Sequence, residues 1–280
     1  MPTLQTAYAQ NAIRSAFGGV ADRAIITGNI HIVNGYAALL AEYDRICISG
    51  NVTNPATGVT WVTGDALRED QATSSRTNAF ASGNDIYIDS TQTDPTATVH
   101  EMLHVNTAAG FLALVGRAIN EGITQRLAVK AVQATGQSVR GSEATYQQEQ
   151  GAVSALINVV GEGTIQEAYF NDPNRLVTGY EAVMGDDSFD VLKRTLNDTP
   201  AGYAAALKIL QPPSVQQKIA AINVLLDWWV SDTDLDLIES IVSTCGLGQR
   251  LAILAAIWPR VSSLWSARQR KRLRLILIRP

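Results

Sequence analysis

The stretch Thr98-Val99-His100-Glu101-Met102-Leu103-His104 places two histidines four residues apart, with a glutamate directly after the first. On an α-helix, residues four apart lie on one face, so both imidazoles can reach the same metal ion. The glutamate then lies beside the metal, where its carboxylate can take a proton from a zinc-bound water. The chain has only three histidines, and two of them occur in this pattern. The spacing therefore predicts a zinc site with His100 and His104 as ligands and Glu101 as the general base.

The flanking sequence predicts that this motif lies on a helix preceded by a strand. Residues 85–89 form a short run of β-branched and aromatic residues between two aspartates, which is typical of a strand. Thr93 or Asp94 can cap the following helix, because Pro95 suits its first position, and Gly110 is placed to end it. A strand followed by a helix in this order suits a cleft along the edge of a sheet.

A catalytic zinc usually has three protein ligands and one open position, so the motif needs a third ligand. The best candidate is Glu121, in the segment Asn120-Glu121-Gly122-Ile123-Thr124. Asn120 can cap a second helix, whose apolar face would contain Ile123, Leu127 and Ala131. A glutamate in the first turn of a helix is also favoured by the helix dipole alone, which is the competing structural interpretation of Glu121.

Together, the two segments resemble the gluzincin class of zinc metallopeptidases. In that class, two histidines and a glutamate on a following helix hold the metal. More narrowly, the chain resembles bacterial gluzincin-like domains in which an Asn-Glu-Gly-hydrophobic-Thr motif supplies this glutamate, as residues 120–124 would here. The similarity extends over residues 20–200, including segments 146–161 and 168–170, and is most specific in the two motifs. It implies a zincin-like fold, Zn²⁺ as the cofactor and a peptide or protein as the substrate.

The tetrahedral oxyanion formed during peptide hydrolysis needs a hydrogen-bond donor in addition to the metal. Tyr146 is the first candidate for this catalytic role, and Tyr169 and Tyr180 are the next ones. Each of these tyrosines also fits a position in the hydrophobic core. Ligand side chains in metal sites usually have hydrogen-bonded support, for which Asn106 and Gln125 are candidates.

The composition describes an ordinary globular protein of 280 residues, 46% hydrophobic and 17% charged, and its net charge of −4 is too small to indicate a partner. Cys47 and Cys245 form neither a disulfide framework nor a metal-binding spacing, so we expect reduced or buried thiols. No apolar run is long enough for a membrane span, and no basic segment followed by an apolar one opens the chain. We therefore expect a protein that is cytoplasmic in the producing cell or exported by a route independent of a signal peptide.

The pattern along the chain predicts an α+β fold, with a small N-terminal sheet, a zincin-like helical active-site core and an all-helical C-terminal module. A break at Gln211-Pro212-Pro213 divides a predicted metallopeptidase domain, residues 1–211, from the module, residues 214–280. Strands are predicted over residues 24–33, 46–48 and 59–63, and a polar surface loop over 64–83. Helices are predicted over 4–17, 36–43, 145–160, 164–170, 189–196 and 203–210.

In the C-terminal module, Ser214 and Gln217 form a predicted capping box for a helix over 215–230. Asp232 or Thr233 would start the next helix, over 235–242, and a further one covers 247–258. Residues 260–280 contain seven Lys or Arg and no acidic residue, interleaved with Leu and Ile. This pattern predicts an amphipathic helix or strand that docks on protein with a basic solvated face. The alternatives are that this tail contacts nucleic acid, an anionic membrane surface or an acidic partner, although the absence of a nucleic-acid motif makes nucleic acid an unexpected partner. A secretion or injection apparatus is a further candidate partner of residues 214–280.

The sequence thus predicts a zinc metallopeptidase that hydrolyses peptide bonds with a water activated by Glu101. A narrower version is a bacterial effector or toxin delivered into a target cell by an injection machine. The alternative is a non-catalytic structural or interaction protein with a vestigial zincin fold, which acts through its C-terminal helices. The remaining histidine, His31, fits a surface or hydrogen-bonded position in a strand better than a ligand role.

Overall fold

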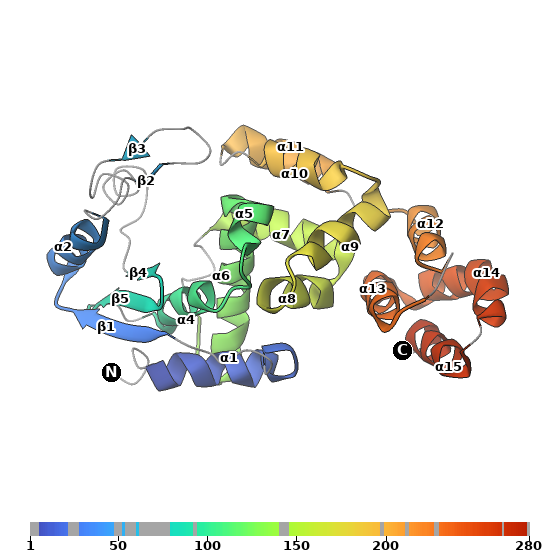
Figure 1. Ribbon diagram of the computed structural model, residues 1–280, viewed down its shortest axis with the longest axis horizontal. Coiled ribbons are helices and arrows are strands. Elements are labelled where there is room, and N and C mark those ends of the chain that lie inside the picture. The colour runs from blue at the N-terminus through green and yellow to red at the C-terminus, as the bar shows by residue number, and fades with distance from the viewer. Residues whose placement is uncertain are drawn as a thin grey trace. The chain divides into compact units, whose positions relative to one another are not determined.

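A computed structural model describes residues 6–21, 28–47, 52–53, 60–61, 79–91, 94–139, 146–196, 199–210, 213–226, 230–264 and 266–278. These residues are mostly helical with a small three-stranded sheet, which agrees with an α+β fold at that coarse level (Figure 1). Contacts group the chain into two compact units, residues 1–107 with 124–147 and residues 108–123 with 148–280. The boundary at residues 123 and 124 falls inside one continuous helix, α6 (Arg117–Ala134).

The sheet of the first unit has the strand order β1 (Asn29–Val33), β5 (Asp85–Asp89), β4 (Ala79–Ser82). β1 is parallel to β5, whereas β4 is antiparallel to it. β5 is the central strand of this sheet. Its residues Ile86, Tyr87, Ile88 and Asp89 are all buried, so β5 lacks the alternation of buried and exposed residues that is typical of a strand with one face in solvent. A second pair, β2 (Val52–Thr53) and β3 (Thr60–Trp61), is antiparallel.

Helices α1 (Thr6–Ala21) and α4 (Pro95–Val105) pack against each other, and α4 also contacts β4 and β5. Helix α2 (Tyr36–Cys47) lies against β5, where Leu39 packs with Phe80 and Tyr87. At the start of β1, a Cβ at Gly28 would lie 2.6 Å from Sδ of Met102, and its φ of 133° also favours glycine. The glycine therefore allows the sheet to approach α4 closely.

The residues before α4 define its start as predicted. The side chain of Asp94 caps the helix by accepting a 2.9 Å hydrogen bond from the backbone N–H of Thr96, whereas Thr93 lies outside the described residues. The predicted end at Gly110 is wrong, because the helix stops at Asn106, whose Nδ2 donates to the carbonyl of Met102 at 2.7 Å. Gly110 has a φ of 81° and instead precedes the short helix α5 (Phe111–Val115).

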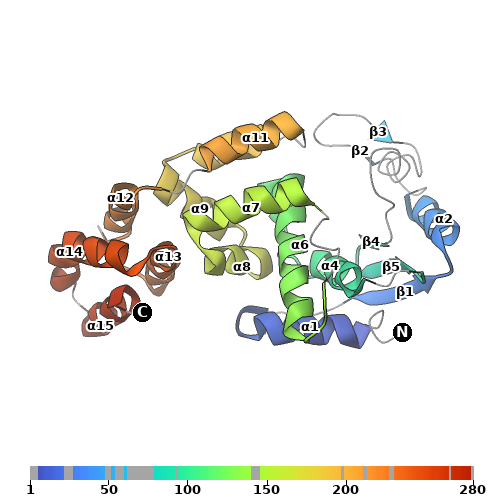
Figure 2. The same cartoon turned by 180° about the vertical axis from the view of Figure 1, so that it is seen from behind.

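Helix α6 begins at Arg117, before the predicted cap Asn120, because Gly116, with a φ of 83°, ends α5 and redirects the chain. Its apolar face is nevertheless the predicted one, since Ile123, Leu127 and Ala131 are fully buried. Figures 1 and 2 show α6 as a long helix next to the shorter α4.

Gly122 allows α6 to approach α7 (Gln147–Val160), since a Cβ there would lie 2.6 Å from the backbone oxygen of Glu149. A backbone atom cannot rotate away, so we expect Gly122→Ala to lower the free energy of unfolding by about 1–3 kcal/mol. Gly151→Ala on α7 is the matched control, because nothing lies within 4 Å of its added Cβ, and it should stabilise the helix by up to about 1 kcal/mol. Denaturant unfolding measures both variants, and equal stabilities would contradict this close approach.

The described residues of the second unit form helices, and buried polar contacts join several of them. Ser240 accepts a hydrogen bond from the hydroxyl of Thr164 at 2.7 Å and donates one to the carbonyl of Val160 at 2.5 Å. The helices that follow α7 are α8 (Glu162–Phe170), α9 (Asn174–Met184), α10 (Ser188–Thr195), α11 (Pro200–Ile209), α12 (Val215–Leu225), α13 (Asp232–Ser243), α14 (Leu247–Ser263) and α15 (Ala267–Ile278).

The C-terminal helices begin at or near the predicted residues, but α12 ends at Leu225 before the predicted residue 230, and α14 continues past the predicted residue 258 to Ser263. The capping box of Ser214 and Gln217 is present at the start of α12. Helix α13 is capped by Ser231, one residue before the first predicted start, because the Ser231 hydroxyl accepts from the N–H of Asp234. The basic segment forms a helix, α15, with Leu273, Ile276 and Leu277 buried, so the helical alternative of the prediction is confirmed.

Other predicted boundaries are wrong because burial outweighs local signals. Helix α1 continues through Gly18 and Gly19 to bury Ala21, and Ile46 lies in α2, packed on the cluster around Leu39, instead of in a strand. Ala79–Ser82 form a strand inside the predicted loop, and helix α9 was not predicted. The parts of the predicted elements over 22–27, 48–51, 54–59, 62–78 and 227–229 lie outside the described residues.

Two further expectations concern the cysteines and membrane segments. Cys245 is a buried free thiol, as expected, whereas the side chain of Cys47 lies outside the described part of the chain. Among the described helices, none combines the length and the apolar character needed to cross a bilayer.

Candidate metal centre

Helices α4 and α6 bring the three predicted ligands together. One donor atom each from His100, His104 and Glu121 lies within 4.8 Å of the other two. The Nε2 atoms of the histidines are 2.9 Å apart, and the ring planes meet at 75°. Two nitrogens bound to one tetrahedral Zn²⁺ are separated by about 3.3 Å, so the imidazoles need only a small movement to share an ion. The donor set therefore fits zinc in both chemistry and spacing.

Gln125 contacts the ring nitrogen of His100 that does not face His104. Its Oε1 lies 2.9 Å from Nδ1 of His100, and both side chains are buried. An amide oxygen can only accept a hydrogen bond, so this contact suits the tautomer of His100 in which Nδ1 carries the proton and the Nε2 lone pair is left for a metal ion. Gln125 follows Glu121 by one helical turn, which explains why both residues face the histidines.

This contact leads to a test of metal affinity. We expect Gln125→Leu to weaken zinc binding by about 10–100-fold, because the imidazole loses the acceptor that fixes its tautomer and orientation. Gln133→Leu makes the same chemical change at an exposed position of the same helix and should leave the affinity unchanged. Competition with a chromophoric chelator gives both values. Equal affinities for the two variants would show that Gln125 does not support the ligand.

Tyr146 also lies at the centre, although it precedes α7 instead of belonging to the helix predicted over 145–160. It immediately precedes α7, with a φ of 56°, and its ring stacks on that of His100 at 5.5 Å between centroids and 8° between planes. A non-glycine residue in the left-handed region costs about 1 kcal/mol or more, which the surrounding contacts must offset. The stack thus places an aromatic hydroxyl-bearing residue next to a predicted ligand.

The other two candidate tyrosines are core residues. Tyr169 is fully buried and makes edge-to-face contacts with Phe111 and Phe170. Tyr180 is fully buried against Phe189, and this burial raises the pKa of its hydroxyl to about 12. Neither belongs to the cluster of His100 and its neighbours, so the structure favours Tyr146 among the three.

Glu101, Asn106 and His31 are the other residues that the sequence singled out. Glu101 is half-buried on α4, directly after His100. Asn106 lies at the end of that helix, where its Nδ2 donates a hydrogen bond to the carbonyl of Met102. His31 is exposed on β1, where its Nε2 is hydrogen-bonded to Asp85 at 2.8 Å and its ring stacks on Tyr87, and this hydrogen bond lowers the pKa of Asp85.

Comparison of the chain with models of known protein families, with curated proteins and with solved structures found no match. The resemblance to gluzincins therefore stays an interpretation of the two motifs. What the chain does has to be inferred from the side chains gathered at α4 and α6.

Proposed function

We propose that this chain is a zinc-dependent peptidase of the gluzincin type. The observation that carries the proposal is the convergence of His100, His104 and Glu121, whose donor atoms lie within 4.8 Å of one another. Two imidazoles and one carboxylate are donors that zinc prefers, and three protein ligands are typical of catalytic zinc sites, whereas structural sites usually have four. The bound ion would polarise a substrate carbonyl and lower the pKa of water.

The remaining roles belong to side chains around these ligands. Glu101 would act as the general base that removes a proton from the attacking water and later as the acid that protonates the leaving amine. Gln125 would keep His100 in the tautomer that a ligand needs, through its 2.9 Å contact with Nδ1. Tyr146, stacked on His100, is the proposed donor of a hydrogen bond to the developing oxyanion.

The activity can be tested without knowing the natural substrate. The purified full chain, loaded with zinc, should produce new peptide ends in a library of peptides derived from a cell proteome, as detected by mass spectrometry. Removal of zinc with a chelator should abolish these cleavages, and added zinc should restore them, because the chain's own residues do not supply the missing Lewis acid. Absence of any zinc-dependent cleavage in such a library would contradict the proposal and favour the non-catalytic alternative.

A further inference from the structure

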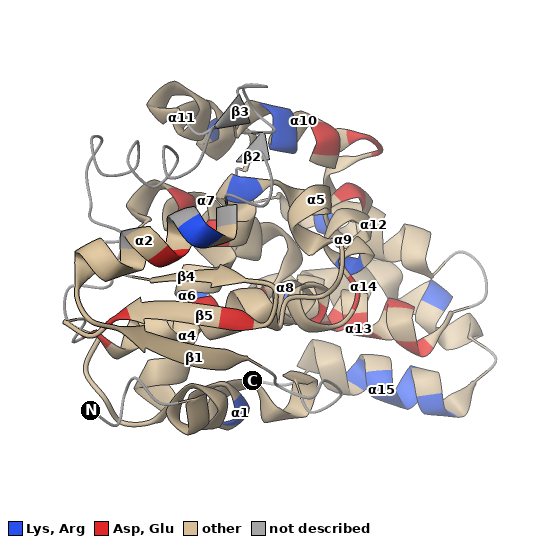
Figure 3. Ribbon diagram, turned by 60° about the vertical axis from the view of Figure 1, so that its left-hand side comes forward, with Lys and Arg blue, Asp and Glu red and all other residues tan. Residues whose placement is uncertain are grey.

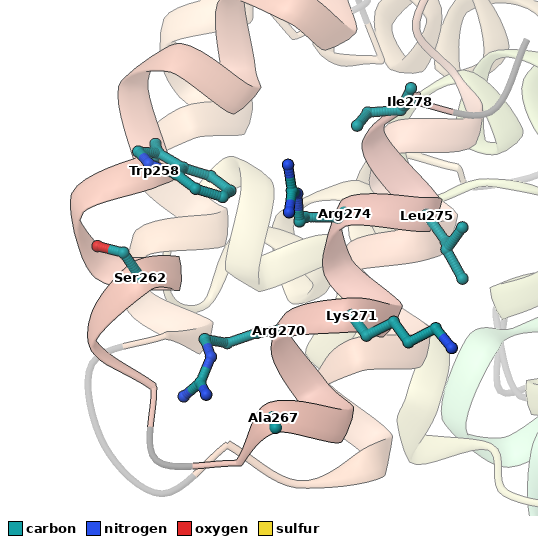
Figure 4. A pocket seen from close by; sticks show the side chains of 8 residues that line it. All are labelled: Trp258, Ser262, Ala267, Arg270, Lys271, Arg274, Leu275 and Ile278. Atoms are coloured by element: carbon teal, nitrogen blue, oxygen red, sulfur yellow. The ribbon is translucent and has the colours of Figure 1, made fainter.

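The last two helices line a groove that the proposed peptidase chemistry does not use. Its volume is about 640 Å³, and it lies between α14 and α15 (Figure 4). The lining residues are Trp258, Ser262, Ala267, Arg270, Lys271, Arg274, Leu275 and Ile278. Three of these are cations and none is an acid, while three others are large apolar side chains.

The apolar side chains of this groove are unusually exposed for their size. Trp258 is 40% exposed, Leu275 52% and Ile278 50%. On α14, Leu251 and Leu247 precede Trp258 by two and three helical turns, and they are also exposed, so an apolar stripe continues along that helix. Side chains of this kind normally face a core, and a stripe of them on the surface of two packed helices marks an interaction surface.

The cations of the groove lack acidic partners in the described part of the chain. Arg274 lies over the ring of Trp258 at 5.2 Å, as Figure 4 shows, and Arg270 donates to the backbone carbonyl of Leu264. No carboxylate of the described residues pairs with Lys271 or Arg274. Their charges are therefore available to a ligand.

The opposite face of α15 contacts an acidic helix, which indicates the kind of partner that α15 can bind. There, Arg272 contacts three carboxylates of α13, those of Asp232, Asp236 and Glu239. Helix α13 also buries Leu235, Ile238 and Ile241, so it is an acidic amphipathic helix docked through both charge and apolar contacts (Figure 3). The groove on the other side repeats this combination of cations and apolar side chains, and none of the described residues that line it is acidic.

We propose that the groove between α14 and α15 binds an acidic amphipathic helix of a protein partner. Leucine or isoleucine side chains of the partner would pack on Trp258, Leu275 and Ile278, and its carboxylates would pair with Lys271 and Arg274. A concave groove suits an inserted helix better than a flat bilayer surface does, which favours a peptide over a membrane.

The test uses the full chain and a fluorescent synthetic helix with leucines at positions i, i+4 and i+7 and glutamates between them. Fluorescence anisotropy should give a Kd below about 100 µM at low salt, and binding should weaken as salt screens the charges. The double variant Lys271→Glu with Arg274→Glu should bind at least about tenfold more weakly, because both pairs become repulsive. Lys208→Glu, an exposed charge reversal on α11, is the control and should bind like the wild type.

Leu275→Ser provides a second variant, which tests the apolar contact without changing the charge. It should also weaken binding, and unfolding curves should show that each variant retains its fold. No binding of the acidic helix, or equal binding of its glutamine counterpart, would overturn the proposal. Binding to vesicles that contain phosphatidylserine, but not to the peptide, would overturn it in favour of a membrane surface. Self-association of the chain that is lost in the double variant would overturn it in favour of a second copy.

Discussion

Glu101→Gln is expected to lower kcat/KM for peptide hydrolysis by about a thousandfold or more while the zinc content stays at about one equivalent. Glutamine has nearly the same size and keeps the packing of α4, but its amide cannot accept a proton from water. The two ligand histidines are unchanged, so metal binding should persist. Rates on a cleaved library peptide, measured beside zinc analysis of the same preparations, give both quantities.

Three further variants help to interpret the expected loss of kcat/KM in Glu101→Gln. Glu101→Asp keeps the carboxylate but withdraws it by one methylene, and full activity in this variant would contradict a positioned base. Tyr146→Phe keeps the ring that stacks on His100 and removes only the hydroxyl, so a smaller loss, of about 10–100-fold in kcat, is expected. Glu181→Gln, on α9 and outside the cluster, should retain wild-type rates.

The second large effect is expected from removal of a ligand. His104→Ala should weaken zinc binding by at least about a thousandfold and abolish hydrolysis, because the remaining imidazole and carboxylate cannot complete a three-ligand site. The side chain of His104 is half-buried, so the variant should still fold and a loss of zinc can be separated from unfolding. Competition with a chromophoric chelator and a thermal unfolding curve measure the two properties. Retention of tight zinc binding in a folded His104→Ala protein would exclude His104 as a ligand.

The sequence predicted the elements that position the ligands because local signals govern them. The cap at Asp94 with Pro95 defines the start of α4, and helical periodicity then places His100 and His104 on one face. The buried face of α6, with Ile123 and its successors, likewise follows from a helical period. These signals act within a few residues, so no knowledge of the tertiary structure is needed to recognise them.

Other features depend on contacts between distant segments and could not be predicted. Tyr146 has a φ of 56°, which aromatic residues rarely adopt, and its stacking on His100 depends on how distant segments pack together. Gln125 could be named as a candidate, but its hydrogen bond to His100 depends on how α6 packs against α4. The groove of α14 and α15 exists only because two helices with exposed apolar stripes pack side by side.

Zinc analysis of the purified wild-type chain beside Glu121→Ala tests the central claim most directly. We predict about one equivalent of zinc in the wild type and a sharply lower content in the variant, with Glu181→Ala as a control that retains the wild-type value. This outcome would establish His100, His104 and Glu121 as a metal site. Absence of zinc from the wild type even after reconstitution, or an undiminished content in Glu121→Ala, would contradict it.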